Sequence, residues 1–264
     1  MLNFNTIAKM LSAIAFLIMV ATNALANLVP LNGVTAGELS RTYPTLITPS
    51  AITFLIWAVI YALLMIYTVY QLGTKKSKRK LSLYMANYIR GLYIVSCLCN
   101  VAWIFAWHFR YIALSLVLMI ALFVCLLLNN KLLYTEELTS KEKLFIRLPF
   151  SVYFGWITVA TAVNTAVLLI SIRWSGYGIS DYVWAMIGIL IIFLVASYIT
   201  LKYSSLAYAI TVIWALIGLI IRHVSKDELS GKYPKVILSL ILCIILMLVE
   251  TGFCLYRKKK NTSI

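Results

Sequence analysis

The chain has 264 residues, of which 63% are apolar and 12% charged, and its formal net charge is +15. A soluble globular chain is about 45–50% apolar and about 25% charged. This composition excludes a water-soluble enzyme and a disordered chain, and it predicts an all-α integral membrane protein. At about 20 residues per crossing, eight spans account for the apolar fraction.

Eight apolar runs are each long enough to cross a bilayer. They cover residues 7–28, 50–72, 86–107, 111–129, 149–171, 183–201, 205–221 and 235–256. The first run contains Ala24-Leu25-Ala26, which is also typical of a signal-peptide cleavage site. A retained helix and a cleaved leader are therefore both open, and the resemblance described below favours the retained helix.

Basic residues are distributed unevenly between the linkers. With eight spans, one side of the membrane holds 16 of the 23 Lys and Arg residues. That side includes the linker Lys75–Lys80, the linker after the fourth run and the tail Arg257–Lys260. Cytoplasmic loops of membrane proteins carry the excess of Lys and Arg, so both termini are expected in the cytoplasm and the protein in the cell membrane. The basic linkers predict contact with anionic lipid, and no nucleic-acid partner is expected.

A long linker follows the first run on the opposite side. Residues 30–48, within an outer loop of 29–49, include Asn32-Gly33, which predicts a turn. A loop of this length is either a lid over the helix bundle or a tether between two helices.

Aromatic and amide side chains recur at helical spacing on three expected helices. In the second run the stripe is Phe54, Trp57, Tyr61, Leu64 and Thr68. In the third run it is Tyr93, Ser96, Asn100, Trp103 and Trp107. In the fifth run it is Tyr153, Trp156, Ala160, Asn164 and Val167. An unbonded amide in hydrocarbon is costly, so each asparagine either bonds to a neighbouring helix or faces a cavity that holds a polar ligand atom.

Motifs for hydrolysis, phosphoryl transfer or metal catalysis are absent from the sequence, so no metal site and no catalytic residue is expected. Cys97 and Cys99 are two residues apart and point to different faces of a helix, which disfavours metal binding. Glu250 lies deep in the last run, where pairing or snorkelling at the cytoplasmic interface is favoured over a functional role.

Three of these patterns resemble helices of the tryptophan-rich sensory protein family, also called the translocator protein or peripheral benzodiazepine receptor family. Pro49 followed by Trp57, Ile60 and Tyr61 resembles the second helix of that family. Asn100-x-x-Trp103 with Trp107 resembles its third helix. Trp156 followed by Ala160-Thr161-Ala162-Val163-Asn164 resembles its fifth helix.

The resemblance implies a domain organisation. Residues 1–172 would form a five-helix translocator-like bundle in which residues 7–28 are the first helix. Residues 173–264 would form a three-helix C-terminal extension with a basic tail, as in a longer bacterial branch of the family.

The resemblance also implies a function, because the family encloses flat hydrophobic ligands, notably porphyrins and other tetrapyrroles. The chain would be a membrane receptor or sensor that needs no cofactor and binds such a ligand between its second, third and fifth helices. The implied ligand-binding residues are Trp57, Tyr61, Asn100, Trp103, Trp107, Trp156, Ala160 and Asn164. The outer-loop tryptophan of the family has no counterpart here, the nearest aromatic residue being Tyr43, so tryptophan-dependent ligand breakdown is not expected.

Two other functions and the oligomeric state are open at this point. The chain would also suit a multi-pass transporter or permease subunit for a small hydrophobic molecule, with Glu250 carrying a proton. An intramembrane enzyme that breaks down its ligand with light or oxygen is the third hypothesis. A homodimer is one alternative for the assembly.

Overall fold

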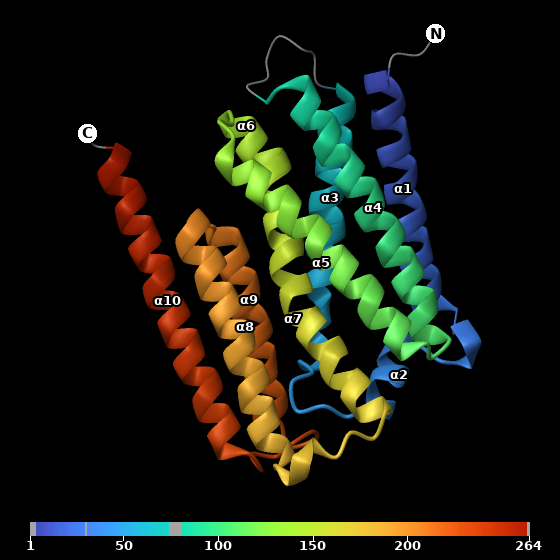
Figure 1. The fold of residues 1–264 in the computed structure, drawn as a ribbon, viewed down its shortest axis with the longest axis vertical. Coiled ribbons are helices and arrows are strands. Elements are labelled where there is room, and N and C mark those ends of the chain that lie inside the picture. Colours follow the sequence, from blue (N-terminus) through green and yellow to red (C-terminus); the bar gives the residue numbers. More distant parts are fainter. Residues whose placement is uncertain (1–3, 30, 74–80, 263–264) are drawn as a thin grey trace.

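A computed structural model describes residues 4–29, 31–73 and 81–262 of the chain. Within these ranges the structure is helical and has no strand, and eight helices are long and apolar enough to cross a membrane (Figure 1). The spans are α1 (Phe4–Leu28), α3 (Ile56–Gly73), α4 (Leu83–His108), α5 (Ile112–Thr135), α7 (Leu148–Ser171), α8 (Asp181–Tyr203), α9 (Leu206–Val224) and α10 (Pro234–Thr262). The predicted fold class is confirmed.

Several helix ends differ from the predicted runs, and those of α4, α5 and α10 show why. The helix α4 begins three residues earlier because Ser82 caps it, its hydroxyl accepting a hydrogen bond from the Met85 N–H at 3.2 Å. The helices α5 and α10 continue past their apolar runs to Thr135 and Thr262. An apolar run marks the length in contact with hydrocarbon, and a helix continues into water until a cap or breaker ends it.

The helix α7 is preceded by an irregular turn. A short helix α6 (Ser140–Glu142) starts at a capping box formed by Thr139 and Glu142, and a π-helical turn η4 (Lys143–Arg147) connects it to α7. Pro149 stands in the first turn of α7 and has no N–H to donate. The Leu148 N–H donates to the Lys143 carbonyl oxygen across the π turn, and α6, η4 and α7 together form one long span.

Five helices pack in a closed ring. The helix α1 contacts α3 and α4, α4 contacts α5, α5 contacts α7, and α7 contacts α3 (Figure 1). The three remaining helices pack on the outside of α7, with α9 nearest to it and α10 against α8 and α9. Gly155 of α7 permits this approach, because a Cβ atom there would lie 2.8 Å from the carbonyl oxygen of Tyr208 on α9.

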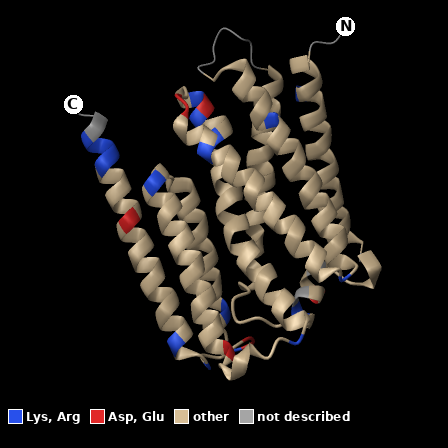
Figure 2. Cartoon of the chain, in the orientation of Figure 1, with Lys and Arg blue, Asp and Glu red and all other residues tan. Residues whose placement is uncertain are grey.

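Charged residues gather at the two ends of the bundle, and its middle is almost free of them (Figure 2). Both chain termini lie at the same end of the bundle (Figure 1). This arrangement is the one expected of an even number of spans with polar ends in water. The basic linker Lys75–Lys80 on which the predicted orientation partly depends lies outside the described residues.

The outer loop lies against the end of the bundle opposite the termini. Its first part is a short helical turn, η1 (Leu31–Gly33), in which Asn32 and Gly33 have φ values of 55° and 75°, so the predicted Asn-Gly turn is confirmed. The helix α2 (Ala36–Thr42) follows and buries Leu39 against Trp107, Ile112 and Val167. A second short helix, η2 (Ala51–Leu55), leads directly into α3.

Candidate ligand-binding site

Five aromatic rings meet between α3 and α7. Trp57 and Tyr61, one turn apart on α3, are stacked with ring centroids 5.5 Å apart. The Trp57 ring meets the edges of Tyr153 and Trp156 on α7 at 6.0 and 6.1 Å. Phe54 contacts Trp156 at 5.5 Å. We refer to these five residues as the α3–α7 aromatic cluster.

The indole N–H of Trp156 has no hydrogen-bond partner. Trp156 is 3% exposed, and its Nε1 atom is buried and unpaired. A buried donor without a partner costs about 1–3 kcal/mol relative to a bonded one, and such a group in a native protein needs an explanation. The cluster therefore contains one donor that a bound molecule can satisfy.

Asn100 connects this cluster to α1. It is fully buried, its Oδ1 atom accepts a hydrogen bond from Asn23 Nδ2 at 2.7 Å, and its Nδ2 atom donates to the Tyr153 hydroxyl at 3.2 Å. The amide thus bonds to two neighbouring helices and fixes the Tyr153 ring of the cluster. A polar group in this position is stabilised because both of its ends are satisfied.

A second group of predicted residues lies nearer the outer end of the ring. Trp103 and Trp107 of α4 are stacked at 5.9 Å, and Tyr43 of the outer loop contacts Trp107 at 6.5 Å. Asn164 of α7 accepts hydrogen bonds from Trp103 Nε1 at 3.2 Å and from Ser115 Oγ at 3.3 Å. We refer to Tyr43, Trp103, Trp107 and Asn164 as the outer cluster.

The structure therefore divides the eight predicted residues between two clusters. Trp57, Tyr61 and Trp156 belong to the first, and Trp103, Trp107 and Asn164 belong to the second. Asn100 touches the first through Tyr153, and Ala160 lies one turn before Asn164, whose Nδ2 atom donates to the Ala160 carbonyl oxygen at 3.2 Å.

The model of the TSPO-like protein family matches residues 9–253 of the chain. The chain belongs to the TSPO-like protein family. The match extends beyond residue 172 and includes α8, α9 and most of α10. No curated protein and no solved structure matches the chain significantly.

In this TSPO-like protein the helix α9 holds the segment that leads into the aromatic cluster. Trp214 Nε1 donates to the Thr53 carbonyl oxygen at 3.1 Å, and the Ser50 N–H donates to the Gly218 carbonyl oxygen at 3.1 Å. Arg222 Nη1 donates to the Thr48 carbonyl oxygen at 2.8 Å. These contacts join η2, which carries Phe54, to the C-terminal helices.

Sequence reasoning missed several residues that shape these clusters. Asn23 carried a signal, since it is an amide within an apolar run, but nothing in the sequence paired it with Asn100. Tyr43 was noted only as the aromatic residue nearest to the missing outer-loop tryptophan, and Ser115 carried no signal of its own. Their places depend on how α5 and the outer loop cross the bundle, which helical periodicity does not determine.

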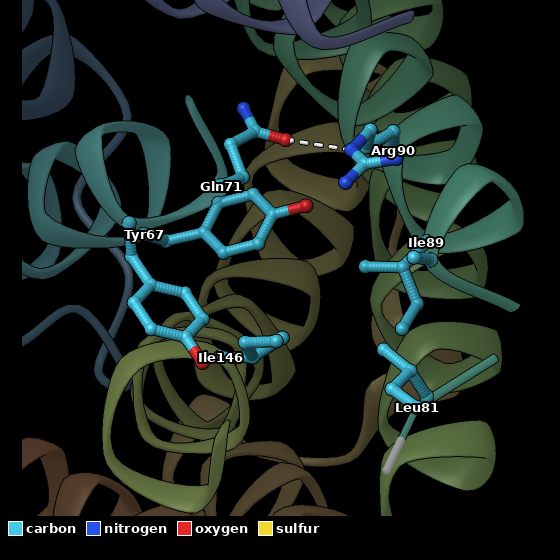
Figure 3. Close-up of a pocket in the computed structure, with 8 residues that line it drawn as sticks. Tyr67, Gln71, Leu81, Ile89, Arg90 and Ile146 are labelled. Atoms are coloured by element: carbon cyan, nitrogen blue, oxygen red, sulfur yellow. Dashed lines mark hydrogen bonds between the residues drawn. The ribbon is translucent and has the colours of Figure 1, made fainter. Parts of the chain in front are cut away.

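A narrow cleft lies between the last turns of α3, the first turns of α4 and η4 (Figure 3). Tyr67, Leu81, Ile89 and Arg90 line it, and Arg90 Nε donates to Gln71 Oε1 at 3.1 Å. Its free volume of about 10 Å³ is enough for one water molecule. None of the eight predicted ligand residues lines this cleft.

Proposed function

We propose that this TSPO-like protein is a membrane receptor or sensor that binds a flat hydrophobic ligand, such as a tetrapyrrole, at the α3–α7 aromatic cluster. Membership of the family supports a sensor or receptor role in the membrane. The observation that carries the location is the buried, unpaired Trp156 N–H inside a group of five rings. A ligand with an acceptor atom would satisfy this donor and stack on the rings.

A ligand would approach the cluster from the side on which its partly exposed rings lie. Trp57 and Tyr61 are partly exposed, and Phe54 is 39% exposed, whereas Tyr153 and Trp156 are buried. We propose that a planar ligand inserts beside the stacked Trp57 and Tyr61 rings and reaches Trp156 behind them. Stacking of this kind contributes about 0.5–1.5 kcal/mol per aromatic pair beyond buried area.

The test is a titration of the purified full chain in nanodiscs with protoporphyrin IX, followed by the shift of the porphyrin absorption band. Trp156→Phe keeps an aromatic ring but removes the donor, so the affinity should fall about 2- to 12-fold, which corresponds to one net hydrogen bond. The matched control is Trp174→Phe, since Trp174 packs on Tyr177 and Trp184 outside the cluster. Equal affinities of both variants and the wild type would refute the location.

A transporter for a small hydrophobic molecule is the second candidate, and one observation favours it. The Oε2 atom of Glu250 in α10 is buried and has no hydrogen-bond partner, which is unusual for an acid that only pairs or snorkels at an interface. Uptake of porphyrin into proteoliposomes that is lost in Glu250→Gln would support transport, and binding without uptake would support the receptor.

A further inference from the structure

Three buried oxygen atoms without hydrogen-bond partners lie on two of the three C-terminal helices. They are Ser197 Oγ and Thr200 Oγ1 of α8 and Glu250 Oε2 of α10. Serine and threonine within a helix usually bond to the carbonyl one turn earlier, as Thr211 and Thr251 do here. Ser197 and Thr200 do not, and Thr200 is fully buried.

These atoms lie at similar depth. The helices α8 and α10 are in contact, and they run in the same direction because the single helix α9 separates them in sequence. Cys254 Sγ lies 3.6 Å from the Thr200 carbonyl oxygen, which sets the register between the two helices. Glu250 precedes Cys254 by about 6 Å along the axis and Ser197 precedes Thr200 by about 4.5 Å, so Glu250 and Ser197 lie within about 2 Å in depth.

One carboxyl oxygen of Glu250, Oε2, is shielded by neighbouring atoms, while the residue as a whole is partly buried. Glu250 shares a face of α10 with Cys243, Met247 and Cys254, all of which are buried. On α8, Ser197 and Thr200 are three residues apart and share a face of that helix. We refer to Ser197, Thr200 and Glu250 as the acid–hydroxyl cluster.

The nearest basic side chains on α8 and α10 interact with other groups. Lys202 Nζ donates to the Tyr198 hydroxyl, and the Arg257 guanidinium lies over the Phe253 ring at 5.6 Å from its centroid. Neither occupies the cluster. Glu250 is partly buried, and its Oε2 atom is shielded without a partner, so a cation bound beside that oxygen would supply the positive partner that these basic side chains do not.

We infer that the acid–hydroxyl cluster is a binding site for a monovalent hard cation such as Na⁺. Carboxylate and hydroxyl oxygens are hard ligands, which hard cations prefer. One carboxylate balances one monovalent charge, whereas a divalent ion would leave a net positive charge within the membrane. This inference does not depend on the ligand proposed for the α3–α7 aromatic cluster.

The experiment measures binding of radioactive ²²Na⁺ to the full chain in nanodiscs by scintillation proximity, and thermal unfolding in NaCl against choline chloride at equal concentration. The wild type should bind Na⁺ saturably, and Na⁺ should raise its Tm by about 2–8 °C. Glu250→Gln should abolish both effects, and Ser197→Ala should weaken binding. The matched control is Asp227→Asn, which alters an exposed acid of the linker after α9 and should leave both effects intact.

Two results would overturn the inference. One is a wild type that neither binds ²²Na⁺ nor gains stability from it. The other is an unchanged Na⁺ response in Glu250→Gln, which would place the ion elsewhere. Gln has nearly the same size as Glu and carries no charge, so Glu250→Gln is expected to fold, and its Tm in choline chloride verifies this.

Discussion

Gly218→Ala should loosen the attachment of η2 to α9. A Cβ atom at Gly218 would lie 2.0 Å from Thr53 Oγ1, 2.5 Å from Thr53 Cγ2 and 2.8 Å from Thr53 Cβ. These distances are far below van der Waals contact, so either Thr53 or the backbone of η2 must move. The same movement would strain the hydrogen bond from the Ser50 N–H to the Gly218 carbonyl oxygen.

The loss of folding free energy has two sources, the overpacking by one methyl group and the weakened hydrogen bond. Overpacking by one methyl group in a close-packed interior costs about 1–3 kcal/mol, and a weakened hydrogen bond adds about 1 kcal/mol. In a chain of this size, about 1–4 kcal/mol corresponds to a Tm lower by roughly 2–16 °C. Gly252→Ala is the matched control, because a Cβ atom at Gly252 meets no atom within 4 Å.

The assay is thermal unfolding of the purified variants, combined with hydrogen exchange of the peptide that covers η2. Gly218→Ala should unfold at lower temperature and exchange faster in η2, whereas Gly252→Ala should match or exceed the wild type. Adding Thr53→Ala to Gly218→Ala removes the two closest atoms and should restore part of the lost stability. A Gly218→Ala variant as stable as Gly252→Ala would refute the reasoning.

Three further predictions concern other parts of the molecule. Asn100→Ala removes the acceptor for Asn23 and the donor to Tyr153, so it should lower the free energy of unfolding by about 1–3 kcal/mol. Chemical denaturation measures this loss, and an unchanged midpoint would contradict a stabilising role of these hydrogen bonds. Hydrogen bonds from the Thr35 backbone and hydroxyl lower the pKa of Glu38. The stabilisation that Glu38 gives to α2 should therefore be complete above the ordinary pKa of 4.5 and lost as the pH falls through the lower pKa of the folded protein. A titration midpoint at or above 4.5 in carboxyl ¹³C NMR would contradict this. The orientation is tested by introducing one cysteine at either end of a variant without exposed native thiols. A membrane-impermeant thiol reagent should label each of these cysteines only after the cells are opened, and labelling in intact cells would contradict cytoplasmic termini.

The fold was predictable from sequence because each span depends on a local property, namely about 20 consecutive apolar residues. Contacts between neighbouring turns were predictable for the same reason. Trp57 and Tyr61 are four residues apart and do stack, as do Trp103 and Trp107.

Contacts between distant segments were not predictable from periodicity. Trp57 meets Trp156 only because α3 and α7 are neighbours in the ring, and Trp214 binds the Thr53 carbonyl oxygen across 161 residues of sequence. Periodicity identifies the face of a helix that is buried but not the helix that covers it. The capping box of Thr139 and Glu142 is an exception, since its Thr-x-x-Glu pattern marks the helix start before α7 in the sequence itself.

The most direct test of the central proposal is an experimental structure of the full chain with protoporphyrin IX bound in nanodiscs. We predict that the porphyrin lies against Trp57 and Tyr61, with an acceptor atom within hydrogen-bond distance of Trp156 Nε1. A porphyrin bound elsewhere, with the five rings packed on one another as they are here, would contradict the proposal.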